Sequence, residues 1–369
     1  MEETYRVGII GRTGHGNYGH GLDTVWAEVP QTQVVALADD DETGRTAAAK
    51  RTGAQQTYAD FREMLEKHRL DIVAVAPRWI DRHHELLMAC IEHGCHIYME
   101  KPFVPTLEQA DEIVRACEMR HVKLAIAHQT RYSPVAHRVK SLIENDEIGQ
   151  VLEVRARGKE DRRGGGEDLW VLGTHLMDLK RLFFGDCADC FARVSLGGRP
   201  VTKADVKEGN EGIGPLAGDG VHAVYSFDNG PKAFFASHRG QAGSPSRFGL
   251  RICGSKGLIE VFTGFMNPAY LLKDSSWSPG RSGAKWQTIT SAGIDQPEPR
   301  KDAGLHAGNV AAVRDLIEAI ETDRPPLGSV YDARSATEMI VAVFESHRLG
   351  RPGPLPLEHR KNPLTMLER

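Results

Sequence analysis

Five short apolar runs in the first third of the chain constrain its fold more than any other feature. They lie at residues 6–11, 33–38, 71–76, 96–99 and 122–127. Between the last two, Thr106 as N-cap, Gln109 three residues later and apolar residues at helical spacing predict a helix. Continuous apolar strands that alternate with helices are typical of a parallel sheet covered on both faces. The sequence therefore predicts an α/β fold that begins with a doubly wound nucleotide-binding domain.

After residue 149 the pattern changes to adjacent strands joined by tight turns. Runs are found at 151–156, 191–196, 221–227, 232–238, 248–253 and 258–262. The turn Asp228-Asn229-Gly230 is a strong hairpin signal, so a largely antiparallel sheet is expected. Helices are predicted at 168–184, 306–322 and 333–349, with loops and at most short strands over 264–304. We place the nucleotide-binding domain at 1–127 and a C-terminal domain at 128–369, whose terminal helices can pack back on the first domain.

A cluster of glycines follows the first apolar run. Six of the 38 glycines lie within residues 8–21. The spacing of Gly14, Gly16 and Gly19 fits a dinucleotide-binding fingerprint, and a second register uses Gly11 with Thr13 in place of a glycine. Either register lets the backbone turn sharply and approach a pyrophosphate at the start of the helix expected after the loop. A flexible glycine turn without a ligand is the alternative.

An acidic residue ends the second apolar run. Asp39 lies 20 residues after Gly19, the distance at which a carboxylate is expected to accept hydrogen bonds from the adenosine ribose. It would also repel a 2′-phosphate, so NAD is predicted as the cofactor in preference to NADP. Since Asp40, Asp41 and Glu42 follow, the alternative is a solvated acidic turn.

Composition excludes several other classes of protein. The formal charge of −4, from 46 Lys and Arg against 50 Asp and Glu, argues against a nucleic-acid binder. Apolar runs such as 72–76 are too short to cross a membrane, and the polar start of the chain leaves no room for a signal peptide, so a cytoplasmic location is expected. Cys187 and Cys190 form an isolated C-x-x-C pair; zinc would need further ligands, so we expect reduced thiols and no metal site.

Motifs in a fixed order extend along nearly the whole chain. They are the glycine loop, Asp39, His83, Gly94, His96, Glu100-Lys101-Pro102, RYSP at 131–134, GGGEDLWVLGTHLMD from Gly164, GSKG at 254–257 and ETDRPPLGSVYDA near the end. In this order and spacing the chain resembles the Gfo/Idh/MocA oxidoreductases, of glucose–fructose oxidoreductase and inositol dehydrogenase type. The resemblance implies a Rossmann domain followed by a C-terminal α+β domain on a large open, mixed or antiparallel sheet.

The resemblance also implies roles for individual residues. Lys101 would lie where nicotinamide meets the substrate and polarise the reacting hydroxyl, and His175 would take its proton as the base. A surface lysine and a structural helix histidine are the respective alternatives. The remaining cofactor contacts implied by the resemblance are Pro77, His83, Glu100, Pro102 and Arg131.

The chain departs from the family pattern one helical turn before His175. Many members carry Asp there, whereas this chain has Val171. Asp168 and Asp178 are the carboxylates that could replace it, and both are predicted to bind substrate. The charged segment 159–166 is either a solvent loop or a substrate loop, and in the second case Asp161 and Arg163 would contact substrate.

Three functions are compatible with these features. The first is NAD-dependent oxidation of a sugar, cyclitol or related polyol. The second is cleavage or elimination of a glycoside by an enzyme that retains and recycles its NAD. Val171 in place of Asp fits this function, because it changes the set of groups available for proton transfer. The third is a non-catalytic nucleotide sensor, which the presence of Lys101 and His175 disfavours. Because an open sheet is a poor surface for a monomer and relatives bury it, a homodimer or homotetramer is expected.

Overall fold

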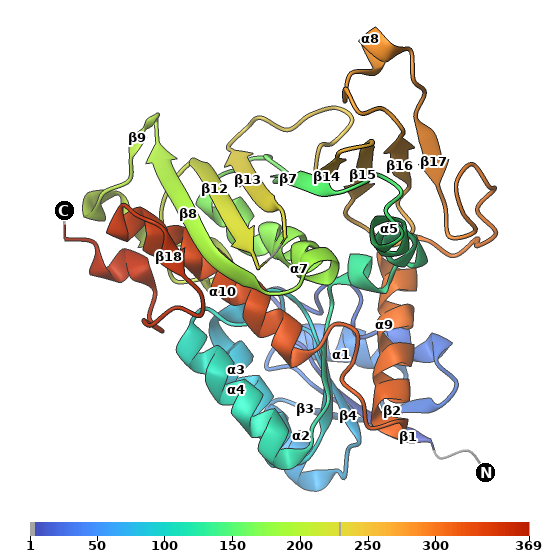
Figure 1. Cartoon of the computed structure of the whole chain (residues 1–369). Coiled ribbons are helices and arrows are strands. Elements are labelled where there is room, and N and C mark those ends of the chain that lie inside the picture. The colour runs from blue at the N-terminus through green and yellow to red at the C-terminus, as the bar shows by residue number, and fades with distance from the viewer. Residues whose placement is uncertain (1–3, 229, 369) are drawn as a thin grey trace. The chain divides into compact units, whose positions relative to one another are not determined.

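The computed structural model describes residues 4–228 and 230–368 (Figure 1). The chain forms two compact units, each described by itself below. The first unit comprises residues 1–129, 210–213 and 305–334, and the second comprises 130–209, 214–304 and 335–369. The first unit is therefore assembled from three separate segments of the chain.

The first unit is built on a six-stranded parallel sheet of strand order β3-β2-β1-β4-β5-β6. Its strands are β1 (Tyr5–Ile10), β2 (Thr32–Ala38), β3 (Gln56–Tyr58), β4 (Ile72–Val75), β5 (His96–Met99) and β6 (Leu124–Ile126). The five predicted runs are all present, and the central strand β4 is buried along its whole length. The sixth strand, β3, lies at the sheet edge and consists of Gln, Thr and Tyr. It was not predicted, because it contains no apolar run.

Helices accompany these strands as the doubly wound pattern requires. They are α1 (Glu42–Thr52), α2 (Phe61–Lys67), α3 (His83–Glu92), α4 (Leu107–Arg120) and α9 (Gly304–Glu321), with short 3₁₀ turns η1 (Val25–Glu28), η2 (Ile80–Arg82), η3 (Gln129–Tyr132) and η5 (Asn210–Gly212). The predicted N-cap of α4 is confirmed, since the Thr106 side chain accepts from the Gln109 amide at 3.3 Å. Figure 1 shows α3 and α4 side by side.

The helix predicted directly after the glycine loop is wrong. Between β1 and β2 the described chain forms turns and the four-residue η1. Gly16, Asn17, Gly19 and Gly21 all have positive φ, which interrupts an α-helix, and Pro30 follows soon after. The loop therefore does not lead into the N-terminus of an α-helix.

The second unit is built on a ten-stranded sheet with the path β17-β16-β15-β14-β7-β13-β12-β8-β18, and β9 pairs with β8. The strands are β7 (Val151–Arg157), β8 (Cys187–Leu196), β9 (Arg199–Pro200), β12 (Gly220–Phe227), β13 (Lys232–His238), β14 (Gly249–Gly254), β15 (Leu258–Phe262), β16 (Ala269–Leu272), β17 (Gln287–Ile289) and β18 (Gly353–Pro354); β10 (Lys207–Glu208) and β11 (Pro215–Leu216) form a separate pair. β7 and β13 run parallel while the other pairs are antiparallel, so the sheet is mixed. The predicted hairpin joins β12 and β13; its turn residue Asn229 lies outside the described residues.

Helices pack against one face of this sheet (Figure 1). Tyr225 Oη of β12 donates a hydrogen bond to the Met339 carbonyl of α10, and the Ala192 amide of β8 donates one to Ser346 Oγ of α10. The helical elements are α5 (Pro134–Glu144), α6 (Gly166–Val171), α7 (Gly173–Phe184), α8 (Pro279–Ser282), α10 (Val330–Leu349), η4 (Lys203–Asp205) and η6 (Pro363–Met366). The single helix predicted over 168–184 is in fact two, α6 and α7, because the backbone leaves helical geometry at Leu172. The helix predicted at 333–349 begins earlier, at Val330, and the one predicted at 306–322 spans Gly304–Glu321. The predicted α/β class, with a doubly wound first sheet and a large mixed second sheet, is confirmed.

Candidate functional site

The glycine loop lies against the ends of the neighbouring strands and leaves no room for a side chain at Gly16 or Gly19. A Cβ at Gly16 would collide with the backbone of Arg78 and Trp79, which follow β4. A Cβ at Gly19 would collide with the Glu100 carboxylate, which follows β5. Both glycines also have positive φ, at 89° and 61°. The loop is thus a close backbone cradle at the carboxyl ends of the strands, the position where doubly wound sheets bind nucleotides.

Asp39 ties this cradle to the end of β2. Its side chain is 2% exposed. Oδ1 accepts from the Thr13 amide at 3.1 Å and the Asp41 amide at 3.1 Å, and Oδ2 accepts from the Thr13 hydroxyl at 2.7 Å. A Cβ at Gly44 would collide with the Thr13 hydroxyl, so the start of α1 closes over this pair. The structure therefore brings two predicted cofactor residues, Asp39 and Thr13, into contact with one another.

A small pocket lies beside this pair. It is lined by Ile10, Gly11, Arg12, Ala38, Asp39, Asp40, Ala59, Phe61, Arg82 and Leu86. Arg12 Nη1 forms an ion pair with Asp81 at 2.7 Å, and Arg82 Nε forms one with Glu85 at 2.7 Å. Sequence reasoning missed Arg12, Asp40 and Arg82, although Arg12 and Asp40 adjoin residues that it selected.

Glu100 anchors the segment that carries Lys101. Its carboxylate is fully buried and accepts from the His20 amide at 2.9 Å and from the Lys101 amide at 3.0 Å. Its Oε2 also lies 2.9 Å from His20 Nδ1. Burial by itself would raise the pKa of Glu100, but the hydrogen bond and charge of His20 outweigh it and lower that pKa. Lys101, only 7% exposed, is thus held by its backbone immediately after β5.

Asn309 of α9 braces the same loop from a distant part of the sequence. It is fully buried, and its Oδ1 accepts from Tyr98 Oη at 2.8 Å and Gln129 Nε2 at 2.9 Å. Its Nδ2 donates to the His20 carbonyl at 2.9 Å. Sequence reasoning missed Asn309; the available signal was a polar residue four positions before Val313 on the apolar stripe of its helix.

His83 joins the segment that follows β4 to the segment that follows β5. It is fully buried, with Nε2 2.8 Å from the Pro77 carbonyl and Nδ1 within 3.0 Å of the carbonyls of Pro102 and Phe103. The segment after β4 is thereby linked to the segment after β5. The structure assigns His83 a bracing contact to Pro77 and Pro102, both of which sequence reasoning had selected for the cofactor.

In the second unit, His175 lies in the first turn of α7. Its amide donates to the Leu172 carbonyl at 3.1 Å, and its partly buried ring meets Phe248 edge-on at 6.4 Å between ring centroids. Val171, at the end of α6, is buried at 2% exposure. The position at which the resemblance led us to expect Asp is therefore apolar in this chain.

The two flanking predicted residues Arg131 and Asp178 form a buried ion pair. Arg131 Nε donates to Asp178 Oδ1 at 2.7 Å, and Nη2 donates to the Asp178 carbonyl at 3.1 Å. Both side chains are almost fully buried. This pair fixes α7, the helix of His175, to the segment after β6.

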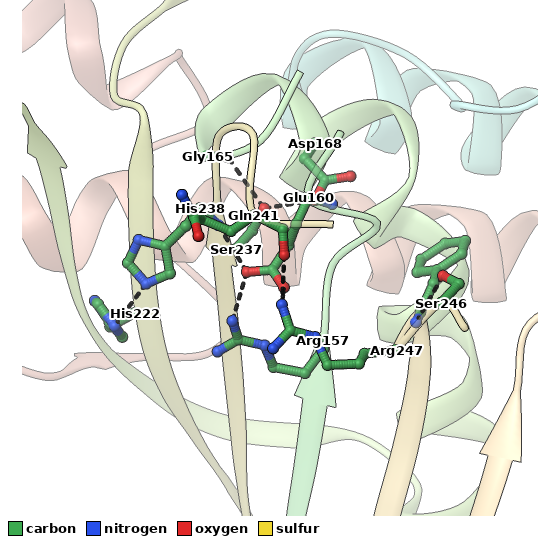
Figure 2. Close-up of polar contacts among 11 residues, drawn as sticks. Arg157, Glu160, Gly165, Asp168, His222, Ser237, His238, Gln241, Ser246 and Arg247 are labelled. Carbon is green, nitrogen blue, oxygen red and sulfur yellow. Dashed lines mark hydrogen bonds and ion pairs between the residues drawn. The ribbon is translucent and has the colours of Figure 1, made fainter. Parts of the chain in front are cut away.

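Asp168 is enclosed within the second unit (Figure 2). Its Oδ2 accepts from the Ser237 hydroxyl at 2.5 Å and the Glu160 amide at 3.1 Å, and the same Ser237 oxygen accepts from the Gly165 amide at 3.0 Å. Burial raises the pKa of Asp168. These bonds join β13 to α6 and to the chain segment that precedes it.

Glu160 is a second buried carboxylate in this segment. Oε1 accepts from Arg157 Nη2 at 2.5 Å and from the His238 amide at 3.0 Å, while Oε2 accepts from Arg247 Nη2 at 2.9 Å (Figure 2). Two guanidinium groups that bond to a buried carboxylate offset the cost of removing its charge from water. The segment before α6 is therefore ordered by paired charges.

Asp161 and Arg163 pair with one another. Arg163 Nη2 donates to Asp161 Oδ2 at 2.6 Å and Nε donates to Oδ1 at 3.1 Å. The hydrogen bond from Arg163 lowers the pKa of Asp161 to about 2. Both side chains keep partial exposure, so a ligand could still reach them.

The residues of the first unit suit a dinucleotide. The glycine cradle, the cavity beside β2 and the lysine after β5 all lie at the carboxyl ends of the strands. Among residues 4–228 and 230–368, no group of three or more His, Cys, Asp or Glu side chains is placed to hold a metal ion. The cysteines are all buried and unpaired by disulfides. No helix of the described chain is long and apolar enough to cross a membrane.

Comparison with known families decides the assignment. Residues 5–128 match the Gfo/Idh/MocA family model described as an oxidoreductase family with an NAD-binding Rossmann fold. Residues 140–357 match the C-terminal alpha/beta domain of the same family. The chain is a Gfo/Idh/MocA oxidoreductase. The expected family, enzyme class and NAD-binding domain are thereby confirmed.

Individual relatives of this Gfo/Idh/MocA chain are dehydrogenases of carbohydrates. D-apiose dehydrogenase of Paraburkholderia graminis is 29% identical over 191 residues, 49% of this chain and 51% of that protein. D-xylose 1-dehydrogenase (NADP(+)) 2 of Haloferax volcanii is 25% identical over 91% of this chain and 96% of that protein. Levoglucosan dehydrogenase in complex with NADH and levoglucosan matches with a TM-score of 0.76 at 20% identity, over 96% of this chain and 100% of that one. The chain spans about half the length of the first curated relatives that it matches.

Proposed function

We propose that this chain is an NAD-dependent dehydrogenase of a sugar, cyclitol or related polyol. The observation that carries the proposal is Lys101, a nearly buried lysine placed at the end of β5 by the bonds of Glu100. The carbohydrate substrates named for the relatives support the substrate class. NAD, when bound, accepts a hydride from the carbon that bears the reacting hydroxyl.

The protein's own residues handle the proton and the charge of this reaction. The Lys101 ammonium group donates a hydrogen bond to the substrate oxygen and stabilises the negative charge that grows there as the proton leaves. His175 takes that proton, since imidazole is basic enough to do so near neutral pH. The carbon–hydrogen bond breaks as the carbonyl forms, so one hydride and one proton leave the substrate. The Arg131–Asp178 pair and the Asp168–Ser237 bond position the helix of His175.

A panel of sugars and polyols offered with NAD tests this proposal. We expect at least one of them to be oxidised with stoichiometric appearance of NADH absorbance. Conversion of a sugar without net NADH would replace the proposal with cofactor-recycling chemistry. Tight NAD binding with no conversion across the panel would replace it with a sensor.

We also propose that the second face of the large sheet pairs with a second copy of the chain. Phe191 and Phe234 on this face are 38% and 39% exposed. Arg155 and Arg251 lie directly opposite one another on neighbouring strands, and each forms an ion pair with a carboxylate of the sheet, Glu153 and Glu260. A partner surface would cover these aromatic rings.

Replacing Phe234 with Glu is expected to dissociate this assembly. The change places a charge among surfaces that must lose water on pairing, so the molar mass from light scattering should fall to that of one chain. Phe234→Tyr is the matched control and should keep the parent mass. A parent protein that is already monomeric, or a Phe234→Glu variant with unchanged mass, would contradict the proposal.

A further inference from the structure

Arginines gather around a pocket on the large sheet of the second unit. Arg155 and Arg157 extend into its lining from β7, Arg251 from β14, and Arg247 from the loop that precedes β14. Glu260 of β15 lines the pocket as well. Guanidinium groups that border a common space are well suited to bind phosphate and carboxylate groups, because their planar forks match the oxygens of these anions.

Two of these arginines are neutralised by carboxylates near the surface. Arg155 Nη2 lies 2.6 Å from Glu153 Oε1, and Arg251 Nη2 lies 2.5 Å from Glu260 Oε1. Each pair carries no net charge. Both arginine side chains are at least half exposed, so these ion pairs contribute little stability and can open towards a ligand.

The other two arginines share a single carboxylate (Figure 2). Arg157 Nη2 donates to Glu160 Oε1 at 2.5 Å, and Arg247 Nη2 donates to Glu160 Oε2 at 2.9 Å. The two guanidinium groups and the one carboxylate therefore carry a net positive charge. Glu160 is 1% exposed and does not line the pocket, whereas both arginines do, so the excess positive charge faces the pocket.

Both arginines that bond to Glu160 keep donors that the protein does not use. Arg157 donates only through Nη2, and Arg247 uses Nη2 for Glu160 and for the Gln241 carbonyl. Among residues 4–228 and 230–368, Nη1 of each arginine has no acceptor. The two side chains are 34% and 51% exposed. Because both bond to one carboxylate they lie close together, and a single oxyanion can accept from both.

We propose that this pocket binds the phosphate group of a small molecule through Arg157 and Arg247. A phosphate group supplies about −1.5 to −2 charges near neutral pH, which balances the excess positive charge. Phe262, half-buried, lines the same pocket and offers an apolar surface to the organic part of a phosphate ester. Neither arginine is among the residues assigned to the cofactor or the polyol, so the inference does not rest on the proposed function.

Titration calorimetry with inorganic phosphate and with glucose 6-phosphate, at constant ionic strength set with sodium chloride, tests the site. The whole chain is first saturated with NAD, so that phosphate does not bind at the glycine loop. We expect both probes to bind to the parent protein. Tighter binding of glucose 6-phosphate would identify a phosphate ester as the ligand, because its sugar can contact Phe262, and equal affinities would identify free phosphate.

Three variants assign this binding to the arginines. Arg247→Gln should weaken phosphate binding about tenfold or more, because a charged donor is lost. Arg193→Gln, on β8 and outside the pocket lining, is the matched control and should keep the parent affinity. Glu160→Gln removes the compensating negative charge and should tighten phosphate binding about threefold or more. If the Arg157–Glu160–Arg247 cluster were merely structural, Glu160→Gln would weaken binding instead.

Two results would overturn the inference. One is a parent protein that binds neither probe, and the other is equal phosphate affinity in the parent, Arg247→Gln and Glu160→Gln. Repeating the titration on Phe234→Glu tests a second occupant: phosphate binding in this variant alone would show that a second copy of the chain fills the pocket, which also overturns the inference. Failure of every polyol to be oxidised would count against the proposed function alone, because these titrations contain no polyol.

Discussion

Replacing Lys101 with Met is expected to lower the turnover number about a thousandfold on whichever polyol the parent oxidises. The ammonium group would be lost, and with it the hydrogen bond that stabilises the developing charge on the substrate oxygen. NAD affinity should change little, because the backbone amide of residue 101 still donates to Glu100. Steady-state formation of NADH, with NAD affinity measured separately, gives both quantities.

Two further variants make this result specific to the side chain of Lys101. Lys101→Arg keeps the positive charge in a different geometry and should recover only part of the lost rate. Lys123→Met removes a lysine of the same unit that pairs with Asp323 near the surface and should leave turnover unchanged. Full turnover in Lys101→Met, with an intact melting curve, would remove Lys101 from the reaction.

Replacing Lys180 with Met is expected to stabilise the protein strongly at neutral pH. Lys180 lies on α7, fully buried, with its ammonium nitrogen 4.1 Å from the ring centre of Tyr225 and 3.5 Å from Met177 Sδ. Burial lowers its pKa to about 7, despite the nearby thiols of Cys187 and Cys190. The unfolded chain, with a pKa of about 10.4, therefore binds a proton that the folded chain releases.

The sign of the pH dependence follows from these two pKa values. Between pH 7 and pH 10 the unfolded state holds more protons, so the parent gains stability as pH rises. At about 1.4 kcal/mol per pH unit, Lys180 costs the folded state on the order of 4 kcal/mol at pH 7. The cost is present in full below pH 7 and disappears as pH rises through the unfolded pKa.

Urea unfolding at pH 7 and pH 9 measures this effect directly. The free-energy difference between Lys180→Met and the parent should shrink by about 2 kcal/mol between the two pH values, because only the parent titrates at this position. The exposed Lys285→Met is the matched control and should follow the parent at both. An equal difference at pH 7 and pH 9 would show that Lys180 keeps its proton on folding.

The fold was largely predictable because apolar runs mark strands that are buried on both faces. β3 was not predicted, because it is a polar strand at the sheet edge, where burial does not require a run of apolar residues. The helix expected after the glycine loop was wrong, since four residues with positive φ interrupt it, among them Asn17. The sequence indicated a longer loop than usual, but it did not show that the loop continues without an α-helix as far as β2.

The site was predictable where residues act through local spacing, and less so where they act through distant contacts. The proximity of Asp39 and Glu100 to the glycine loop follows from the strand order. The bonds of Asn309 to Tyr98 and of Arg131 to Asp178 join residues 211 and 47 positions apart, and no local pattern selects such partners. Sequence alone also could not show that Asp39 accepts a hydrogen bond from the Thr13 hydroxyl, since this bond depends on the packing of Thr13 against Gly44.

The bond from Asn309 to the His20 carbonyl spans 289 residues, and it sets an order of events during synthesis. At roughly 5 to 20 residues per second, the ribosome needs about 15 to 60 seconds to travel from one partner to the other. Through that interval the nascent chain carries the glycine loop without the helix that braces it. Most of the second unit is translated first, so the cofactor site matures only near the end of translation.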